Sequence, residues 1–473
     1  MGKVPVFESD LTRRAFIRRG AAAAAWAATW GVVSARQRSD RDVRAFVLTA
    51  RESDVAVARS GAWRTWTYDG QVPGPELRVR EGDVVRVTLR NQLPQPTTIH
   101  WHGVPVPNAM DGVPGVTQAP VEPGESFTYE FVASTPGTYF YHSHSGLQLD
   151  RGLYGPLIVE PAGGGAARVD REHIVLLDDW LDITPEEAYA QLQRSRGMGG
   201  GMMGGSDPLY AGYLLNGATS AVAPPLQTAR GETVRLRLIN AASATAFRVG
   251  LVGRRLTVTH ADGQEVRPVQ VDSLIIGMGE RYAVTFVADN PDAGPLIAGP
   301  VDSVVPGIVV ALQYGGALVP TRAVPVWPSA LLRGRALRYA DLQPVAATPP
   351  SASPIPQVIP LTLGSAMRGG YVWTINGQAY PNADAIRLES GRPVRLRIVN
   401  GTMMRHPMHL HGHFFTLRQA AAASGSAPLK DTALVDAMGS VDLEFETDNP
   451  GRWLFHCHHA YHMEAGMARV LEY

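Results

Sequence analysis

The sequence of 473 residues contains one cysteine, Cys457. An intrachain disulfide is therefore excluded, and the thiol is free, joined to another chain, or a metal ligand. The charge is also unbiased, because 43 basic and 43 acidic residues cancel and no long run of one sign occurs. This balance indicates neither a nucleic-acid partner nor an anionic membrane surface.

Long apolar runs are scarce as well. The clearest one extends from Ala21 to Val33, after the basic segment TRRAFIRRG, and small residues follow it as a cleavage site. The run is shorter than the roughly 20 residues that a transmembrane helix needs. Residues 1–35 are therefore interpreted as a twin-arginine signal peptide, with an uncleaved anchor as the alternative. This predicts export by the twin-arginine translocase to the periplasm, or secretion where no outer membrane exists, and no membrane anchor on the mature protein.

Helical patterns are sparse, whereas 49 glycines and 36 prolines separate short alternating strands. One strand pattern occurs three times, as GDVVRVTLRN from Gly82, GETVRLRLIN from Gly231 and GRPVRLRIVN from Gly391. Apolar residues alternate with arginine in each copy, as in a strand with one face on a core and one in water. The repeat predicts an all-β protein of three Greek-key β-sandwich domains.

The domain limits follow from composition. A glycine cluster begins at Gly163, and a stretch rich in proline, alanine and serine begins at Ala346, as is typical of linkers. We therefore expect the first domain over residues 41–162, the second over 163–345 and the third over 346–473.

The clearest helix pattern starts at Thr184, an N-cap residue, with Glu187 completing a capping box. The helix leads into the segment RGMGGGMMGGSD, whose methionines are Met198, Met202 and Met203. Thioethers are soft ligands suited to Cu(I), but a flexible linker with incidental methionines explains the same composition. Both interpretations stay open.

Histidine is concentrated in four short motifs, HWHG, HSH, HPMHLHG and HCHHAYH, and the middle repeat has no such motif. Imidazole is the commonest protein ligand for zinc, copper and iron, so four such clusters indicate metal sites. Ten of the histidines in these motifs are the candidate ligands: His100, His102, His142, His144, His406, His409, His411, His456, His458 and His462.

Strand geometry divides these residues into two sites, because successive side chains point to opposite faces of a strand. His456 and His458 share one face, and Cys457 points to the other. The same alternation pairs His406 with Cys457, provided that Pro407 leaves its strand undisturbed.

Counting by face gives one mixed site and one histidine-only site. A thiolate, two imidazoles and a weak axial thioether make the trigonal set of a blue-copper electron-transfer centre. The candidates for this set are Cys457, His406, His462 and Met467. The other eight histidines are enough to hold three metals where the first and third domains meet. The segment around Cys457 then connects the two sites covalently.

The motifs HWHG, HSHSG, HPMHLHGH and HCHHAYHMEAGM resemble those of multicopper oxidases, which include laccases, cuprous oxidases and bilirubin oxidases. The surroundings, such as MDGVPGVTQAPVEPGESFTYEF, are most similar to the bacterial copper-resistance oxidases of that family. The resemblance covers the mature chain and implies cupredoxin-like domains with four copper ions. It assigns the type 1 copper to His406, Cys457, His462 and Met467, the type 2 copper to His100 and His409, and the type 3 pair to His102, His142, His144, His411, His456 and His458.

Two acidic residues are the candidate catalytic groups. Asp111 resembles a carboxylate that supplies protons to the cluster in bacterial members, and a plain Asp-Gly turn is the alternative. Many bacterial members have an acidic residue directly after the second type 1 histidine, where this chain has Met463 and then Glu464. This departure leaves the proton route on that side open. The remaining histidines are interpreted as structural or surface residues: His173, His260, His413 and His459.

The implied reaction couples four one-electron oxidations of a donor at the type 1 copper to the reduction of dioxygen to water. The donor is expected near His462 and is either Cu(I), in copper tolerance, or a phenol or aromatic amine. The methionine-bearing segment favours Cu(I). A copper-sequestering protein and a copper nitrite reductase are the alternatives, but the ligand set is complete and eight histidines exceed a mononuclear site. We expect a monomer.

Overall fold

The computed structural model describes ten stretches of the chain, namely residues 42–58, 61–163, 169–197, 207–290, 294–315, 317–318, 324–345, 356–366, 370–418 and 427–473. The expected signal peptide and the three methionines of the RGMGGGMMGGSD segment lie outside these stretches. Within them, no helix is both long and apolar enough to cross a bilayer.

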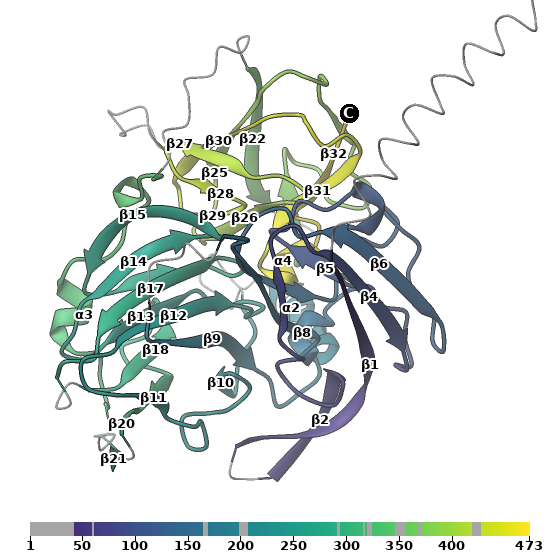
Figure 1. Cartoon of the computed structure of the whole chain (residues 1–473). Helices are drawn as coiled ribbons and strands as arrows, with labels where there is room; N and C mark the ends of the chain where they lie inside the picture. The colour runs from purple at the N-terminus through teal and green to yellow at the C-terminus, as the bar shows by residue number, and fades with distance from the viewer. Residues whose placement is uncertain are drawn as a thin grey trace, which may run out of the picture.

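The strands form three units that meet at the centre of the molecule, as Figure 1 shows. The first unit has two four-stranded sheets, in the orders β2-β1-β4-β6 and β3-β8-β7-β5. Its elements are β1 (Val43–Ala58), β2 (Gly61–Tyr68), β3 (Leu77–Arg80), β4 (Val84–Asn91), β5 (His100–His102), η1 (Asn108–Met110), β6 (Ser126–Val132), β7 (Gly137–His142), η2 (Leu149–Arg151) and β8 (Tyr154–Glu160).

The second unit has a six-stranded sheet in the order β10-β9-β12-β17-β14-β15, with smaller sheets β16-β13-β18-β19 and β11-β20-β21. Its strands are β9 (Arg171–Trp180), β10 (Gly212–Leu215), β11 (Leu226–Thr228), β12 (Thr233–Asn240), β13 (Phe247–Leu251), β14 (Leu256–Ala261), β15 (Gln264–Val271), β16 (Leu274–Ile276), β17 (Arg281–Val287), β18 (Leu296–Pro300), β19 (Ile308–Val310), β20 (Leu312–Tyr314) and β21 (Ala317–Leu318). Its helices are α2 (Pro185–Gly197), α3 (Ser329–Arg333) and η3 (Tyr339–Asp341).

The third unit has a six-stranded sheet in the order β23-β22-β25-β30-β27-β28 and a five-stranded sheet in the order β24-β32-β31-β26-β29. Its elements are β22 (Gln357–Ser365), β23 (Trp373–Ile375), β24 (Ile386–Arg387), β25 (Val394–Asn400), β26 (His406–Leu410), β27 (Phe415–Arg418), β28 (Leu429–Lys430), β29 (Thr432–Val435), β30 (Ser440–Phe445), β31 (Arg452–Cys457), α4 (Ala460–Glu464) and β32 (Ala468–Glu472).

The repeated strand pattern has the same place in all three units. Strands β4, β12 and β25 each pair in parallel with the first strand of their unit and antiparallel with a later one. Each copy ends in an asparagine whose amide donates to backbone carbonyls and whose oxygen accepts from a backbone N–H: Asn91, Asn240 and Asn400. The all-β prediction is confirmed, whereas the exact domain limits stay a prediction.

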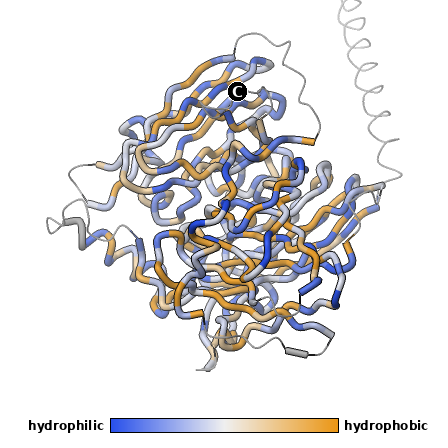
Figure 2. The backbone as a smooth tube through the Cα atoms, turned by 90° about the vertical axis from the view of Figure 1, so that its left-hand side faces the viewer, coloured by the Kyte–Doolittle hydropathy of each residue, from blue (hydrophilic) through white to orange (hydrophobic). Residues whose placement is uncertain are grey.

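The alternation of polar and apolar residues within strands is visible along the chain in Figure 2. In β4 the apolar side chains are buried and Arg86 and Arg90 face water, as expected. In β12 the expectation is wrong, because Arg235 and Arg237 are buried. Arg237 donates to the hydroxyl of Thr138 at 2.9 Å, so this face packs against β7 of the first unit.

The helix predicted from the capping box is present as α2. The backbone N–H of Thr184 donates to the Glu187 carboxylate at 2.9 Å, and the N–H of Glu187 donates to the Thr184 hydroxyl at 3.2 Å. These two reciprocal bonds satisfy donors that the first turn would otherwise leave without partners.

Candidate metal centres

Nine of the ten candidate histidines lie on two pairs of antiparallel strands or within two residues of the end of one of these strands. In the first unit, β5 pairs with β7 so that His100 lies opposite His142. In the third unit, β26 pairs with β31 so that His409 lies opposite His456. Because directly opposite residues point to the same face of a sheet, each pair projects its rings together. Figure 1 shows β5, β26 and β31 close together at the centre, beside α4.

Pro407 leaves β26 intact, because the strand runs unbroken from His406 to Leu410. Met408 lies opposite Cys457, so the residue two positions earlier, His406, shares the face of the thiol. The Sγ atom of Cys457 lies 3.5 Å from Nδ1 of His406 and 3.8 Å from Nδ1 of His462. The predicted pairing of His406 with Cys457 is confirmed, and the three side chains form one buried group suited to a metal ion.

The surroundings hold this group rigidly. His406 contacts the Thr402 hydroxyl through Nε2 at 2.8 Å, which leaves Nδ1 directed at the thiol. The ring of His462 is covered on two sides, by His459 at 3.6 Å between centroids and 5° between planes, and by Trp373 at 4.0 Å. Met467 is fully buried in the same apolar cluster as Cys457. His462 itself is fully buried, and the docking of a donor near it stays a prediction.

The remaining eight histidines gather on the other side of β31, at the boundary of the first and third units. Nε2 of His456 lies 3.0 Å from Nε2 of His411 and 3.4 Å from Nε2 of His144. His100 and His409 approach each other at 3.4 Å between their Nε2 atoms. Rings from both units therefore interleave, and several triplets place their nitrogens within 4.8 Å of one another.

The outward nitrogens of these rings are anchored, mostly to the backbone. Four Nδ1 atoms bond carbonyl oxygens at 2.9 to 3.0 Å: His100 to Asp111, His142 to Ser143, His409 to Asp431 and His456 to Cys457. An N–H on Nδ1 leaves the lone pair of Nε2 free to face the cluster. This second layer of contacts sets the orientation that metal ligation needs.

The donor set fits copper. Within the described residues, three of the buried rings have a nitrogen without a hydrogen-bond partner, namely His102, His142 and His458. Burial lowers the pKa of these imidazoles well below the ordinary value, so they are neutral ligands. Burial also raises the pKa of the Cys457 thiol, and a bound metal reverses this by taking the thiolate. A soft thiolate with imidazoles at one site and imidazoles alone at the other suits copper.

Asp111 lies inside the cluster rather than only in a turn. Its carboxylate accepts from Nδ1 of His411 at 2.9 Å and also lies 3.2 Å from Nδ1 of His100, and it is fully buried. Its neighbour Gly112 does take the left-handed conformation of a turn, with φ +83°. Asp111 therefore contacts two cluster rings and also precedes a turn, and its role in supplying protons stays a prediction.

Glu464 has a different setting, on the exposed face of α4. It lines a pocket of about 560 Å³ that also reaches His144 and Met463. A second cavity of about 10 Å³ lies among the cluster histidines, and its lining includes Met463 but not Glu464. The thioether of Met463 thus stands between the outer pocket and the cluster. Partial burial and the carboxylate of Glu186 raise the pKa of Glu464.

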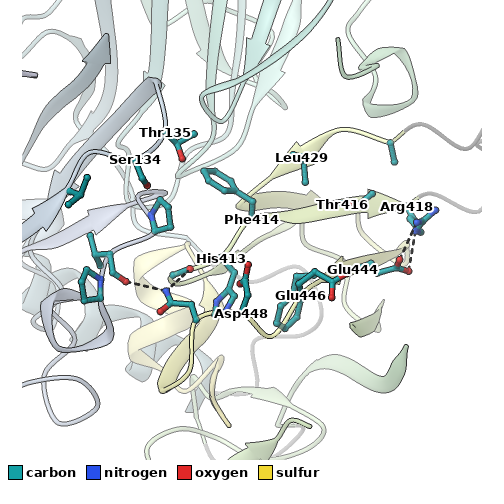
Figure 3. Close-up of a pocket in the computed structure, with 18 residues that line it drawn as sticks. Ser134, Thr135, His413, Phe414, Thr416, Arg418, Leu429, Glu444, Glu446 and Asp448 are labelled. Carbon is teal, nitrogen blue, oxygen red and sulfur yellow. Dashed lines mark hydrogen bonds and ion pairs between the residues drawn. The ribbon is translucent and has the colours of Figure 1, made fainter. Parts of the chain in front are cut away.

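His413 belongs to neither group of metal-ligating rings. It lines a cavity of about 740 Å³ between the first and third units, together with Phe414 and Glu446 (Figure 3). Its Nδ1 bonds the carbonyl of His411 at 2.9 Å and its Nε2 contacts the Tyr473 hydroxyl at 2.7 Å. Both nitrogens are satisfied by protein groups, as expected for a structural histidine.

Sequence reasoning missed groups that hold the two sites. His459 was interpreted as structural or surface, but it stacks on His462, and its place directly after HCH was the one available signal. Asp431 and Arg281 form a fully buried ion pair at 2.6 Å beside His102. They are 150 residues apart and belong to no motif, so only the folded chain reveals them.

Comparisons with known proteins agree with this geometry. Multicopper oxidase family models match residues 49–163, 171–295 and 353–473. The chain is 38% identical to "multicopper oxidase MmcO" of Mycobacterium tuberculosis, covering 86% of this chain and 83% of that protein. It is 28% identical to "copper resistance protein A" of Escherichia coli, covering 90% of this chain and 91% of that protein.

Among solved structures, a laccase from Botrytis aclada superposes with a TM-score of 0.78 at 27% identity, over 91% of this chain and 88% of that one. A multicopper oxidase from Pseudomonas thermotolerans gives 0.72 at 27% identity, over 92% and 100%. The three family matches span most of the chain and coincide with the three strand units around one set of histidines. The chain therefore belongs to the multicopper oxidase family.

Proposed function

We propose that this protein oxidises Cu(I) at the Cys457 site and passes the electrons to dioxygen at the eight-histidine cluster, in copper tolerance. The observation that carries the proposal is the arrangement around β31, with the sulfur on one face and two cluster rings, His456 and His458, on the other. A single covalent segment then joins the site that receives electrons to the site that uses them.

Members of this family hold four copper ions, one of type 1, one of type 2 and a type 3 pair. We assign them as the motif resemblance does. The type 1 ion takes His406, Cys457, His462 and Met467; the type 2 ion takes His100 and His409; the type 3 pair takes His102, His142, His144, His411, His456 and His458. When bound, these ions supply one-electron transfer at the first site and four-electron reduction of dioxygen to water at the second.

The protein residues orient the ligands and handle protons. Asp111, in contact with His411 and His100, is placed to hold a proton beside the cluster or release it there. Glu464 is proposed as the acid of the outer pocket, where partial burial and the carboxylate of Glu186 raise its pKa and so favour the protonated form. Glu464 and the cluster ring of His144 line the same outer pocket, whereas the small cavity among the cluster rings is lined by Met463 and not by Glu464.

A pocket of about 720 Å³ beside the Cys457 site supports Cu(I) as the donor. Its lining includes the thioethers of Met403 and Met404 and the carboxylates of Asp207 and Asp302. Met403 is 69% exposed, which makes its sulfur available to a soft metal ion. Among the charged residues near this pocket, Asp302 and Asp436 share the one guanidinium of Arg405, so the pocket carries a negative excess that attracts cations.

Oxygen uptake by the copper-loaded protein tests the donor. We expect Met403→Leu to raise the KM for Cu(I) roughly tenfold, about 1.4 kcal/mol of lost binding, and to leave guaiacol oxidation unchanged. Met438→Leu is the matched control, because Met438 is 66% exposed and does not line the pocket. Guaiacol oxidation without Cu(I) oxidation in the unaltered protein would instead establish a phenol or aromatic amine oxidase.

We further propose that the mature protein is a monomer exported to the periplasm, or secreted where no outer membrane exists. The twin arginines at Arg13 and Arg14 support this route. Replacing both with lysine should leave the precursor inside the cell. A folded precursor that is still exported would contradict use of the twin-arginine translocase, and sedimentation of the mature protein tests the monomer.

A further inference from the structure

We propose that His459 is the residue through which electrons pass from the donor pocket to His462. This rests on the proposed function, because it names the path from that donor site to the type 1 ligands. His462 is fully buried, and a donor in the pocket lined by Met403 and Asp207 therefore cannot touch it. His459 is itself only 1% exposed, but it lines this pocket, whereas His462 does not. The ring of His459 therefore lies between the pocket and His462.

The geometry of the two rings is that of a bridge. Their centroids lie 3.6 Å apart and their planes differ by 5°, so the faces are in van der Waals contact. Parallel π systems at contact distance overlap directly, which gives an electron a short through-space step from one ring to the other. The other ring over His462, that of Trp373, is 4.0 Å away and tilted by 37°, and Trp373 does not line the donor pocket.

The outer edge of His459 points toward the donor. Its Nε2 donates to Oδ1 of Asp207 at 2.8 Å, and the Asp207 side chain is 48% exposed. A cation held by this carboxylate would be one hydrogen bond from the stacked pair. The inner edge is fixed as well, because Nδ1 accepts the backbone N–H of His462 at 3.4 Å. The two contacts set the ring parallel to His462.

The electron balance follows from the established reaction. One Cu(I) bound at Asp207 loses one electron and leaves as Cu(II), and that electron crosses from His459 to His462 and the type 1 site. Four such events, with four protons, reduce one dioxygen to two water molecules. The donor electrons, dioxygen and the four protons, which come from solvent, are all that is consumed.

A purely structural role must be separated from this relay, since His459 also caps α4. Two variants do so. In His459→Asn the side-chain oxygen can still cap the helix, but the ring is lost. In His459→Phe the ring stays over His462, but the cap and the bond to Asp207 are lost.

The measurement is the anaerobic loss of blue absorption after mixing the copper-loaded protein with Cu(I) in acetonitrile or with guaiacol. We expect His459→Asn to slow the reduction roughly tenfold, equivalent to about 1.4 kcal/mol of activation free energy, and His459→Phe to keep at least about half the rate. The blue absorption, the reduction potential and the affinity for Ag(I), measured by calorimetry, should stay at their unaltered values in His459→Asn.

An Asn variant that is reduced at the unaltered rate, or a Phe variant as slow as the Asn variant, would overturn the relay. A change in the reduction potential of the blue site in His459→Asn would assign His459 a structural role instead. If His459→Asn loses its blue absorption, only His459→Phe tests the relay. A His459→Phe variant that keeps its blue absorption but is reduced slowly would contradict the relay. Reduction of the unaltered protein by guaiacol but not by Cu(I) would refute Cu(I) as the donor. The two His459 variants would then test the electron path with guaiacol as the donor.

Discussion

The first and third units share the pairing of the repeated strand with the middle unit, but the middle unit brings different groups to the metal sites. The outer units supply all ten clustered histidines, whereas the middle unit supplies charge and backbone. Its repeated strand β12 buries both of its arginines, Arg235 and Arg237, whereas Arg86 and Arg90 of β4 face water. The middle unit therefore supplies no clustered histidine but packs against both units that do.

Arg281 is the centre of this packing. It begins β17 of the middle unit and is fully buried. Its guanidinium bonds both carboxylate oxygens of Asp431 in the third unit at 2.6 Å and the carbonyl of Thr138 in the first unit at 3.1 Å. Asp431 in turn lies 3.2 Å from Nε2 of His102. One side chain of the middle unit thus joins both ligand-bearing units.

A second contact comes from backbone. Gly279 of the middle unit has φ +83°, and a Cβ there would lie 2.9 Å from carbons of both His102 and His458. The chain therefore passes against two cluster rings with no room for a side chain. The comparison indicates that metal ligation by two units depends on a third unit that holds them together.

Removing the central charge should have the largest effect. Arg281→Gln leaves the buried carboxylate of Asp431 without its guanidinium partner, whereas Asp262 keeps its ion pair with Lys430. Breaking a buried pair in this way costs about 3–5 kcal/mol, so the free energy of unfolding in urea should fall by that amount. Arg86→Gln is the control, because its ion pair with Glu130 is exposed and worth about 0–1 kcal/mol. A loss below about 1 kcal/mol for Arg281→Gln would show that the middle unit is not needed to hold the cluster.

Replacing Asp111, a carboxylate of the first unit, should lower the rate of oxygen reduction rather than the free energy of unfolding. Asp111→Asn keeps an oxygen for His411 but removes the charge and the exchangeable proton. Oxygen reduction should slow roughly a hundredfold, the lower end of what a positioned acid or base contributes. Anaerobic reduction of the blue site should keep its rate, and a slower blue-site reduction would contradict a role confined to the cluster.

The backbone contact of the middle unit predicts a smaller change. Gly279→Ala combines a left-handed backbone with a clash against His102, and should cost about 1–3 kcal/mol and alter the absorption of the type 3 pair. Gly231→Ala is a matched control, with φ +86° but open space around its Cβ. Equal losses for the two variants, with the spectrum unchanged, would show that the contact with the rings has no effect.

The last prediction concerns pH and the ligand-bearing units alone. In the metal-free protein, burial lowers the pKa of His406 to about 3 and of His456 to about 4, from 6.5. The unfolded chain binds protons at these positions below pH 6.5 while the folded chain does not. The free energy of unfolding should therefore be level above pH 6.5 and fall below it, by up to about 1.4 kcal/mol per pH unit for each ring. Urea unfolding of the metal-free protein measures this, and stability that stays level down to about pH 4 would contradict it.

The sequence alone predicted the parts that follow from local periodicity. The three copies of one strand gave the fold class, and the alternation within HCH placed Cys457 and His456 on opposite faces without coordinates. Long-range partners could not be predicted. Arg281 and Asp431 are 150 residues apart and meet only in the folded chain. Likewise, nothing in the pattern GETVRLRLIN distinguishes the buried Arg235 and Arg237 from solvated arginines.

The burial of His462 could not be predicted for a related reason. A motif fixes which residues are neighbours in the strand, but the rings above and below His462 come from Trp373 on another strand and from His459 in a cap position. Their contact depends on how α4 leaves β31, which no strand periodicity describes.

The separation of the two metal sites by β31 is tested most directly by Cys457→Ser. Copper content, electron paramagnetic resonance and oxygen uptake should be measured on the same preparation. We expect three copper ions to remain out of four, with the type 2 signal unchanged, and the blue absorption and donor-driven oxygen uptake lost. A variant that keeps its blue colour, or that loses the copper of the histidine cluster along with it, would contradict the account.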